Sequence, residues 1–147
     1  AQTVTNLNIL YFILSESRFF DNSWIADKYE TLASETIKAE DIETFLNQDA
    51  YYLSSQLSLK ALSSELRIST NALSKAINSE FGMNFNDYIN KKRVKEAKLR
   101  LLDAQYAHLT IEAIGESVGF KSKSAFYNAF KKHTDTSPSY FIKQSTS

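Results

Sequence analysis

From Leu57 onwards the chain carries apolar residues three and four positions apart, which is the spacing of helices that bury one face. A Ser or Thr that can cap a helix stands directly before four of these stretches. No stretch keeps the alternation of polar and apolar residues that a half-buried strand shows, so we expect an all-α fold. The expected helices begin after Ser58, Ser69, Thr110 and Ser122, a longer one covers residues 86–103, and a short one starts at Pro138.

The first 52 residues have a weaker apolar pattern, and we expect them to form a helical extension. Apolar residues within 4–14 fit one face of a helix, although residues 9–14 fit a buried strand equally well. The pattern becomes clearer from about Ala39, where acidic residues stand in the first turn and favour a helix start. The apolar face of that helix is expected to consist of Ile42, Phe45 and Leu46.

The helical part contains an internal repeat, because residues 59–89 match residues 111–142 in pattern with one extra residue in the second turn. Each copy is a short helix, a turn of three or four residues and a second capped helix, which is the helix-turn-helix arrangement. Ala61 and Ala113 are small residues where the paired helices have to approach closely. We therefore expect an extension over 1–52 and a double helix-turn-helix domain over 53–147, with the first unit at 57–85, the linker helix at 86–103 and the second unit at 109–143.

The net charge of zero conceals a change of sign along the chain. Residues 1–54 carry three Lys/Arg and nine Asp/Glu, whereas residues 55–147 carry fourteen and eight, which gives −6 and +6. Such asymmetry is typical of a nucleic-acid-binding part joined to another part. The absence of Cys excludes disulfides and Cys-based zinc sites and fits a reducing cytoplasm. The longest apolar run has six residues, whereas a membrane span needs about 20.

The second helix of each copy has a polar outer face with short or basic side chains near its N-terminus. Such side chains are suited to base edges in the major groove, and the first acidic residue on these faces is Glu80. The duplication, the small residues and these faces together favour DNA binding over an ordinary helical bundle. The faces consist of Thr70, Asn71, Ser74, Lys75 and Asn78 in the first copy and of Lys123, Ser124, Tyr127, Asn128 and Lys131 in the second.

Residues 57–142 resemble the DNA-binding domain of the AraC/XylS family of bacterial transcription regulators. Two residues depart from the family pattern, since Asp135 stands in place of a usual Gly and Ile142 in place of a common Arg. Residues 28–52 are similar to the lead-in of Bacteroidetes-type members, in which a membrane-spanning or multi-part sensor region often precedes the domain. Because the chain begins at Ala1 rather than Met, we expect such a part upstream. The most specific matching positions are Gly119, Phe120, Ser124, Phe126, Phe130, Ser137, Pro138 and Phe141.

The resemblance implies two units that enter successive major-groove segments about 34 Å apart and cover about 20 base pairs of double-stranded DNA. It also implies a cytoplasmic transcription regulator, an activator by family habit, with RNA polymerase as a partner and no cofactor. The implied base contacts are Asn71, Ser74, Lys75, Lys123, Ser124, Tyr127 and Asn128. The expected phosphate contacts are Thr70, Lys131, Lys132, Lys91 and Lys92, together with backbone N–H groups at the capped helix N-termini.

Each of these side chains could instead lie on an ordinary solvated helix face. Arg93, which follows Lys91 and Lys92 on the linker helix, could contact phosphate as they do, or it could brace the two units through an internal salt bridge. An enzyme is disfavoured, because His108 and His133 are isolated in sequence and no Gly-rich phosphate loop occurs. A protein-interaction or dimerisation module remains the alternative function. Aromatic residues that either pack onto the first unit, as we favour, or join two copies are Tyr11, Phe12, Phe19, Phe20, Trp24, Tyr51 and Tyr52.

Overall fold

The computed structural model describes residues 37–145, which form seven α-helices and two 3-10 helices with no strand among them. The expected all-α fold is therefore confirmed, while the predictions for residues 4–14 and for the aromatic residues up to Trp24 lie outside the described part. The helices are α3 (Ala39–Asn47), α4 (Leu59–Glu65), α5 (Thr70–Phe81), α6 (Phe85–Leu102), α7 (Ile111–Ser117), α8 (Lys123–Thr134) and α9 (Pro138–Ser145), and the 3-10 helices are η1 (Gln48–Leu53) and η2 (Ala104–Tyr106).

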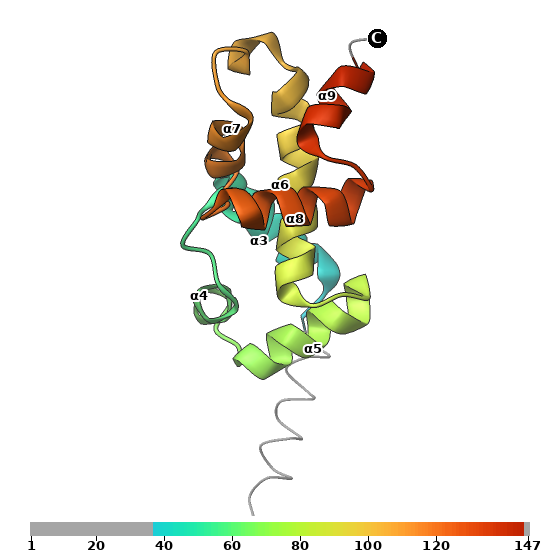
Figure 1. Cartoon of the computed structure of the whole chain (residues 1–147). Helices are drawn as coiled ribbons and strands as arrows, with labels where there is room; N and C mark the ends of the chain where they lie inside the picture. The colour runs from blue at the N-terminus through green and yellow to red at the C-terminus, as the bar shows by residue number, and fades with distance from the viewer. Residues whose placement is uncertain (1–36, 146–147) are drawn as a thin grey trace, which may run out of the picture.

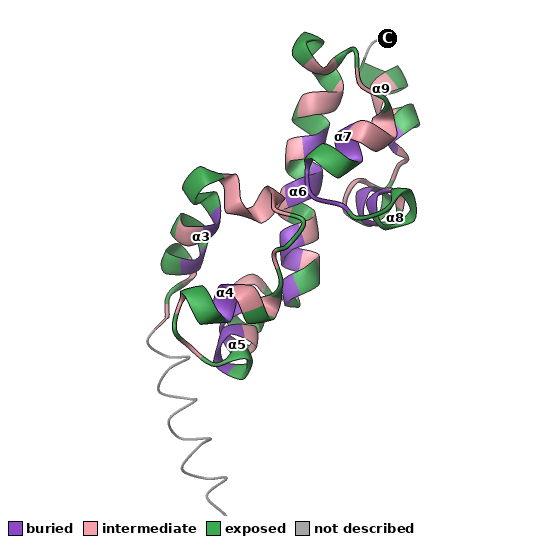
Figure 2. Ribbon diagram, turned by 90° about the vertical axis from the view of Figure 1, so that its left-hand side faces the viewer, coloured by how far each residue is buried: buried purple, intermediate pink, exposed green. Residues whose placement is uncertain are grey.

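Helix α6 is the central element, with α4 and α5 at one end, α7 and α9 toward the other, and α8 crossing it between them (Figure 1). Figure 2 shows α3 and α8 on opposite sides of α6. The helix begins one residue earlier than the sequence suggested, because the Asn84 side chain accepts a hydrogen bond from the Asp87 amide at 2.9 Å and caps the first turn. It also ends one residue earlier, at Leu102. Since α6 contacts helices of both units, it fixes how the two units are placed relative to each other.

Two hydrophobic cores lie along α6, one for each unit, and Figure 2 shows the buried segments on both. The first core includes Ile42 and Leu46 of α3, both fully buried, so the upstream helix is an integral part of the first unit. Tyr51 and Tyr52 pack against the same core, as favoured for these two aromatic residues. The second core consists of Val94, Ala97, Ile114, Val118, Phe120, Phe126, Ala129 and Phe130.

The backbone confirms the repeat at the level of helix caps and turns. The four predicted capping side chains each accept a hydrogen bond from a backbone amide three residues later, at 3.0–3.2 Å. Each unit also has two residues with left-handed backbone, one in the turn between its two helices and one at the end of its second helix. The turn residues are Arg67 (φ 56°) and Gly119 (φ 96°), and the helix-end residues are Gly82 (φ 64°) and Asp135 (φ 60°).

Arg93 is nearly buried, with 9% of its surface exposed, and it ties α6 to the segment before α4. Its Nε donates to the Tyr52 carbonyl at 2.8 Å and its Nη2 to the Ser54 carbonyl at 2.7 Å. The guanidinium also lies 5.8 Å from the ring centre of Phe120 in the second unit. Within residues 37–145, Arg93 therefore braces both units, as in the alternative considered for it, but through two carbonyls and a ring instead of a salt bridge.

Candidate nucleic-acid interface

The first candidate recognition helix is α5, whose start is fixed by the Ser69 hydroxyl accepting from the Ala72 amide at 3.0 Å. Four apolar residues of α5 are buried, three of them in the first core, and the polar side chains of the helix therefore face outward. Among the expected DNA contacts, Thr70, Asn71 and Lys75 are exposed and Ser74 is half-buried. The structure therefore brings these four residues together on the outer face of one helix.

The second candidate recognition helix is α8, which buries its aromatic face and begins after the Ser122 cap. Lys123, Ser124 and Asn128 are exposed on its outer face, and Tyr127 is half-buried. Lys131 is exposed one turn further along. The expected contacts of the second unit thus also share one helix face.

Glu112, on the first turn of α7, approaches this face and was not among the residues expected from the sequence. Its Oε1 accepts a hydrogen bond from Lys123 Nζ at 2.7 Å and from the Tyr127 hydroxyl at 3.2 Å. The ammonium of Lys123 lowers the pKa of Glu112, and Glu112 raises the pKa of Lys123. One carboxylate therefore contacts two of the expected base contacts.

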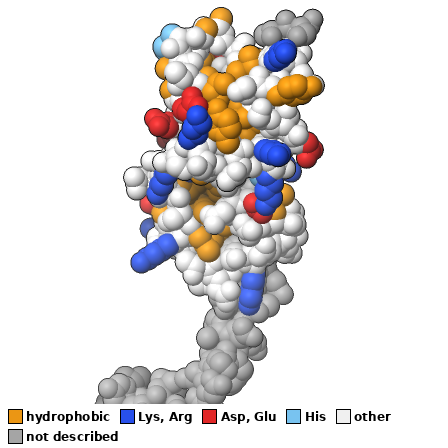
Figure 3. Space-filling view, viewed as in Figure 1, with side chains coloured by type: hydrophobic (Ala, Val, Ile, Leu, Met, Phe, Trp, Pro, Cys, Tyr) orange, Lys and Arg blue, Asp and Glu red, His pale blue; other side chains and the backbone are white. Residues whose placement is uncertain are grey.

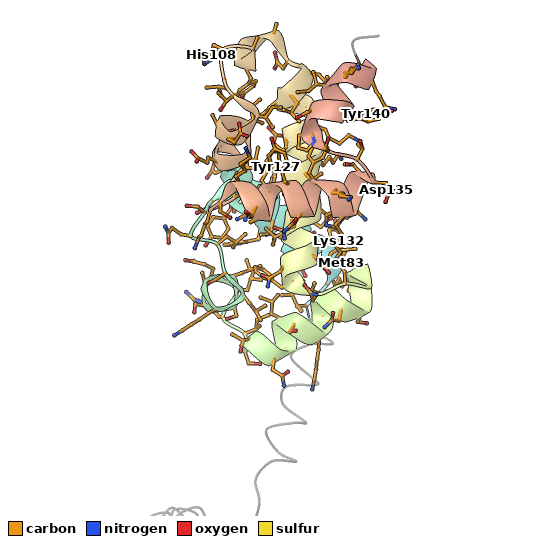
Figure 4. All side chains as sticks on the ribbon, in the orientation of Figure 1. Met83, His108, Tyr127, Lys132, Asp135 and Tyr140 are labelled. Carbon is orange, nitrogen blue, oxygen red and sulfur yellow. The ribbon has the colours of Figure 1, made fainter. Side chains whose placement is uncertain are left out.

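The expected phosphate contacts on and near α6 have different surroundings. Lys132, which Figure 4 labels, forms an ion pair of 2.6 Å through its Nζ with Asp87 in the first turn of α6. Lys92 is 19% exposed and lies over the Tyr52 and Tyr88 rings, 3.9 Å from the Glu43 carboxylate of α3. Figure 3 shows basic and acidic side chains side by side at two places on the face that carries α8. The Lys92 ammonium is therefore directed toward Glu43 of α3.

Lys91 is exposed and lines a groove of about 400 Å³ between α6 and the ends of α5 and α8. His133 borders the same groove, and its Nε2 is buried with no hydrogen-bond partner among the described residues. Burial lowers the pKa of His133, which favours the neutral imidazole. Neither this groove nor any other cluster within residues 37–145 groups three residues that could hold a metal ion.

The two recognition helices have the same orientation. Both cross the view of Figure 1 from left to right, and both are seen nearly end-on in Figure 2. A helix of this kind fits the major groove, and two parallel helices on one rigid axis can enter two successive groove segments. None of the helices in residues 37–145 has the length and apolar content that a membrane span needs.

Comparison with proteins of known sequence also supports a helix-turn-helix protein. A profile of a family described as a helix-turn-helix domain matches residues 62–144. The transcriptional activator AggR of Escherichia coli is 32% identical over 90 residues, which are 61% of this chain and 32% of AggR. The transcriptional regulatory protein HptR of Staphylococcus aureus is 29% identical over 112 residues, which are 74% of this chain and 43% of HptR. The chain therefore spans less than half the length of these relatives.

Solved structures show the same fold. The C-terminal domain of the two-component response regulator yesN from Fusobacterium nucleatum superimposes with a TM-score of 0.61 and 34% identity, covering 70% of this chain and 95% of that one. The C-terminal domain of AraT, a response regulator from Geobacillus stearothermophilus, gives a TM-score of 0.57 and 25% identity, covering 87% and 88%.

The fold and the two exposed recognition helices define a double helix-turn-helix domain. With the matched profile over more than half of the chain, the chain belongs to the AraC/XylS family of helix-turn-helix transcription regulators. The resemblance inferred from the sequence is therefore confirmed, and the family is one of DNA-binding regulators.

Proposed function

We propose that this chain is the sequence-specific DNA-reading part of a transcription activator, which contacts two successive major-groove segments with α5 and α8. The observation that carries the proposal is the parallel placement of two capped helices on α6, each with a polar outer face. A substitution that removes a base-edge contact should relax the sequence preference, whereas one that removes a phosphate contact should weaken binding to every sequence.

The base contacts of the proposal are the exposed or half-buried outer residues of α5 and α8. Asn can pair bidentately with adenine, and Lys can donate to guanine O6 and N7. Thr70, Lys131 and Lys91 are proposed phosphate contacts, because each is exposed. Lys132 can join them only by leaving Asp87, and Lys92 only by leaving the α3 side of α6. The proposed base contacts are Asn71, Ser74, Lys75, Lys123, Ser124, Tyr127 and Asn128.

The wider setting of the domain is part of the proposal. The named relatives include a transcriptional activator, and two similar solved structures are C-terminal domains of response regulators. We propose that a sensor region precedes this chain in the full protein, that RNA polymerase is its partner and that it acts in the cytoplasm. Residues 1–52 are proposed to join the sensor to the reader, with α3 fixed on the first unit.

The test is selection of bound sequences from a randomised duplex library, followed by titration of the selected site at several salt concentrations. A site with two short motifs about one helical turn apart is expected, and the affinity should fall steeply with salt. Asn71→Ala should relax one motif and Lys123→Ala the other, so that each variant is the control for its partner. Weak binding to every duplex at low salt would contradict the proposal and would favour a protein-interaction module.

A further inference from the structure

Glu112 joins two proposed base contacts of α8 that lie one helical turn apart. Its Oε1 accepts from Lys123 Nζ at 2.7 Å and from the Tyr127 hydroxyl at 3.2 Å. The Lys123 ammonium also lies 5.4 Å from the centre of the Tyr127 ring, within the range of a cation–π contact. The three side chains thus contact one another in one cluster between α7 and α8, and Figure 4 labels Tyr127 at this place.

The cluster is open to solvent, which makes it replaceable by a ligand. The side chains of Lys123 and Glu112 are 65% and 39% exposed, and water screens an exposed ion pair strongly. A base edge or a phosphate that approaches α8 can therefore compete with Glu112 for the ammonium. The carboxylate itself repels phosphate oxygens, because both are negatively charged.

We propose that Glu112 is a positioning residue for sequence specificity, which holds Lys123 back from phosphates until a matching base edge replaces the carboxylate. The inference rests on the proposed function. On an unmatched sequence, Lys123 stays paired with Glu112 and releases no counterion from the DNA. On a matched sequence, the O6 and N7 acceptors of a guanine take over the ammonium. Specificity rises because unmatched DNA gains nothing from this lysine.

The first unit lacks this arrangement, which supports a role in reading rather than in folding. The repeat places Lys60 at the position of Glu112 and Ser74 at the position of Tyr127. Both units nevertheless have the same helix pair and the same caps. A carboxylate at this position is therefore not needed to build the helix-turn-helix.

The test compares the full chain with Glu112→Gln in titrations over a salt series, on the selected site and on an unrelated duplex. The variant frees Lys123 for any nearby phosphate, so the slope of log K against log salt on the unrelated duplex should steepen by about 0.9. The selected motif should lose its preference at one position of the second half-site. Melting of the variant at the wild-type temperature shows that the fold is intact.

Glu116→Gln is the matched control, since it removes the same charge from the same helix at an exposed residue. It should leave the slope and the motif unchanged. The double variant Glu112→Gln with Lys123→Ala should lose the extra slope, because the effect acts through the lysine. If wild type binds a selected site and Glu112→Gln changes neither slope nor motif, the role of Glu112 is overturned and the proposed function stands. If wild type binds no duplex, both are overturned.

Discussion

The first helix-turn-helix unit lies between α3 and α6, whereas the second lies between α6 and α9, and each core contains residues of both neighbouring helices. Ile42 and Leu46 of α3 are fully buried in the first core. In the second unit, Pro138 at the start of α9 is buried and Phe141 packs against Phe130 with ring centres 5.7 Å apart. The two copies thus share α6, which follows the first and precedes the second, and they differ in their outer neighbour, which is α3 for the first copy and α9 for the second.

The two cores also differ in the size of their side chains. The second core contains Phe126 where the first has Leu73, and a glycine faces this ring. A Cβ added to Gly115 would lie 2.6 Å from Cδ1 of Phe126, so the ring requires the glycine. The equivalent residues in the first unit are Ser63 and Leu73, which are both buried. The larger side chain at position 126 thus occurs together with the smaller residue at position 115.

The largest expected effect comes from removing the upstream support of the first unit. Leu46→Ala should lower the free energy of unfolding by about 2–5 kcal/mol, because it leaves a cavity in a fully buried site. Urea unfolding measures the loss, and amide signals of α4 and α5 should broaden before those of α7 and α8. Leu99→Ala is the control, since Leu99 is 62% exposed and should change stability by less than about 0.5 kcal/mol. Equal losses in the two variants would contradict an essential role of α3.

The next largest effect concerns the left-handed glycine in the turn of the second unit, Gly119. Gly119→Ala forces a Cβ onto a left-handed backbone and places it against the Leu53 carbonyl and 3.0 Å from Arg93 Nε. The loss should exceed the about 1–2 kcal/mol of backbone strain alone. Gly82→Ala is the control with strain and no clash, because nothing lies within 4 Å of its added Cβ. Equal melting temperatures for the two variants would show that the contacts around Gly119 relax freely.

The reverse substitutions should stabilise the protein. Arg67→Gly relieves a left-handed arginine in the first turn and should raise the free energy of unfolding by about 1 kcal/mol. Asp135→Gly should gain less, because Asp tolerates this backbone better than Arg does. Thermal melting compares the two gains. A loss of stability in Arg67→Gly would mean that the arginine side chain contributes more than its backbone strain removes.

The smallest expected effect concerns pH and affects only the second unit, because the equivalent of His133 in the first unit is Glu80. Burial lowers the pKa of His133, Asp87 opposes this shift, and Lys132 and Lys91 add to it. The unfolded chain therefore binds the proton first, so stability is full above the ordinary His pKa of about 6.5 and falls as the pH drops below it. His133→Gln should lose less stability between pH 7.5 and pH 5 in urea titrations. An equal loss in both proteins would rule out His133 as the cause.

Features that depend on short sequence distances were predictable. The caps, the two turns and the apolar faces each involve residues within one or two helical turns, so the sequence shows them directly. The left-handed Asp135 was also expected, since the family pattern has Gly there. The double helix-turn-helix fold follows from these local signals and their repetition.

Contacts between helices were not predictable, because they depend on how the helices pack. Lys132 forms an ion pair with Asp87, which lies 45 residues earlier in the chain, and Lys92 forms one with Glu43 of α3. Aligning the two copies places an acidic residue, Glu112, opposite Lys60 at a position beside the recognition helix. This reversal of charge is a sequence signal that could have pointed to Glu112.

The continuous helix α6 has a consequence for the evolution of the promoters that this regulator would read. Its 18 residues span about 27 Å without a break, and both units are packed on it. One base pair inserted between the two half-sites would turn the second groove away by roughly 34°, and a rigid helix cannot follow. Binding sites can therefore drift in their bases more readily than in their spacing. A genome search for its targets should keep the spacing between the half-sites constant and allow the bases within them to vary.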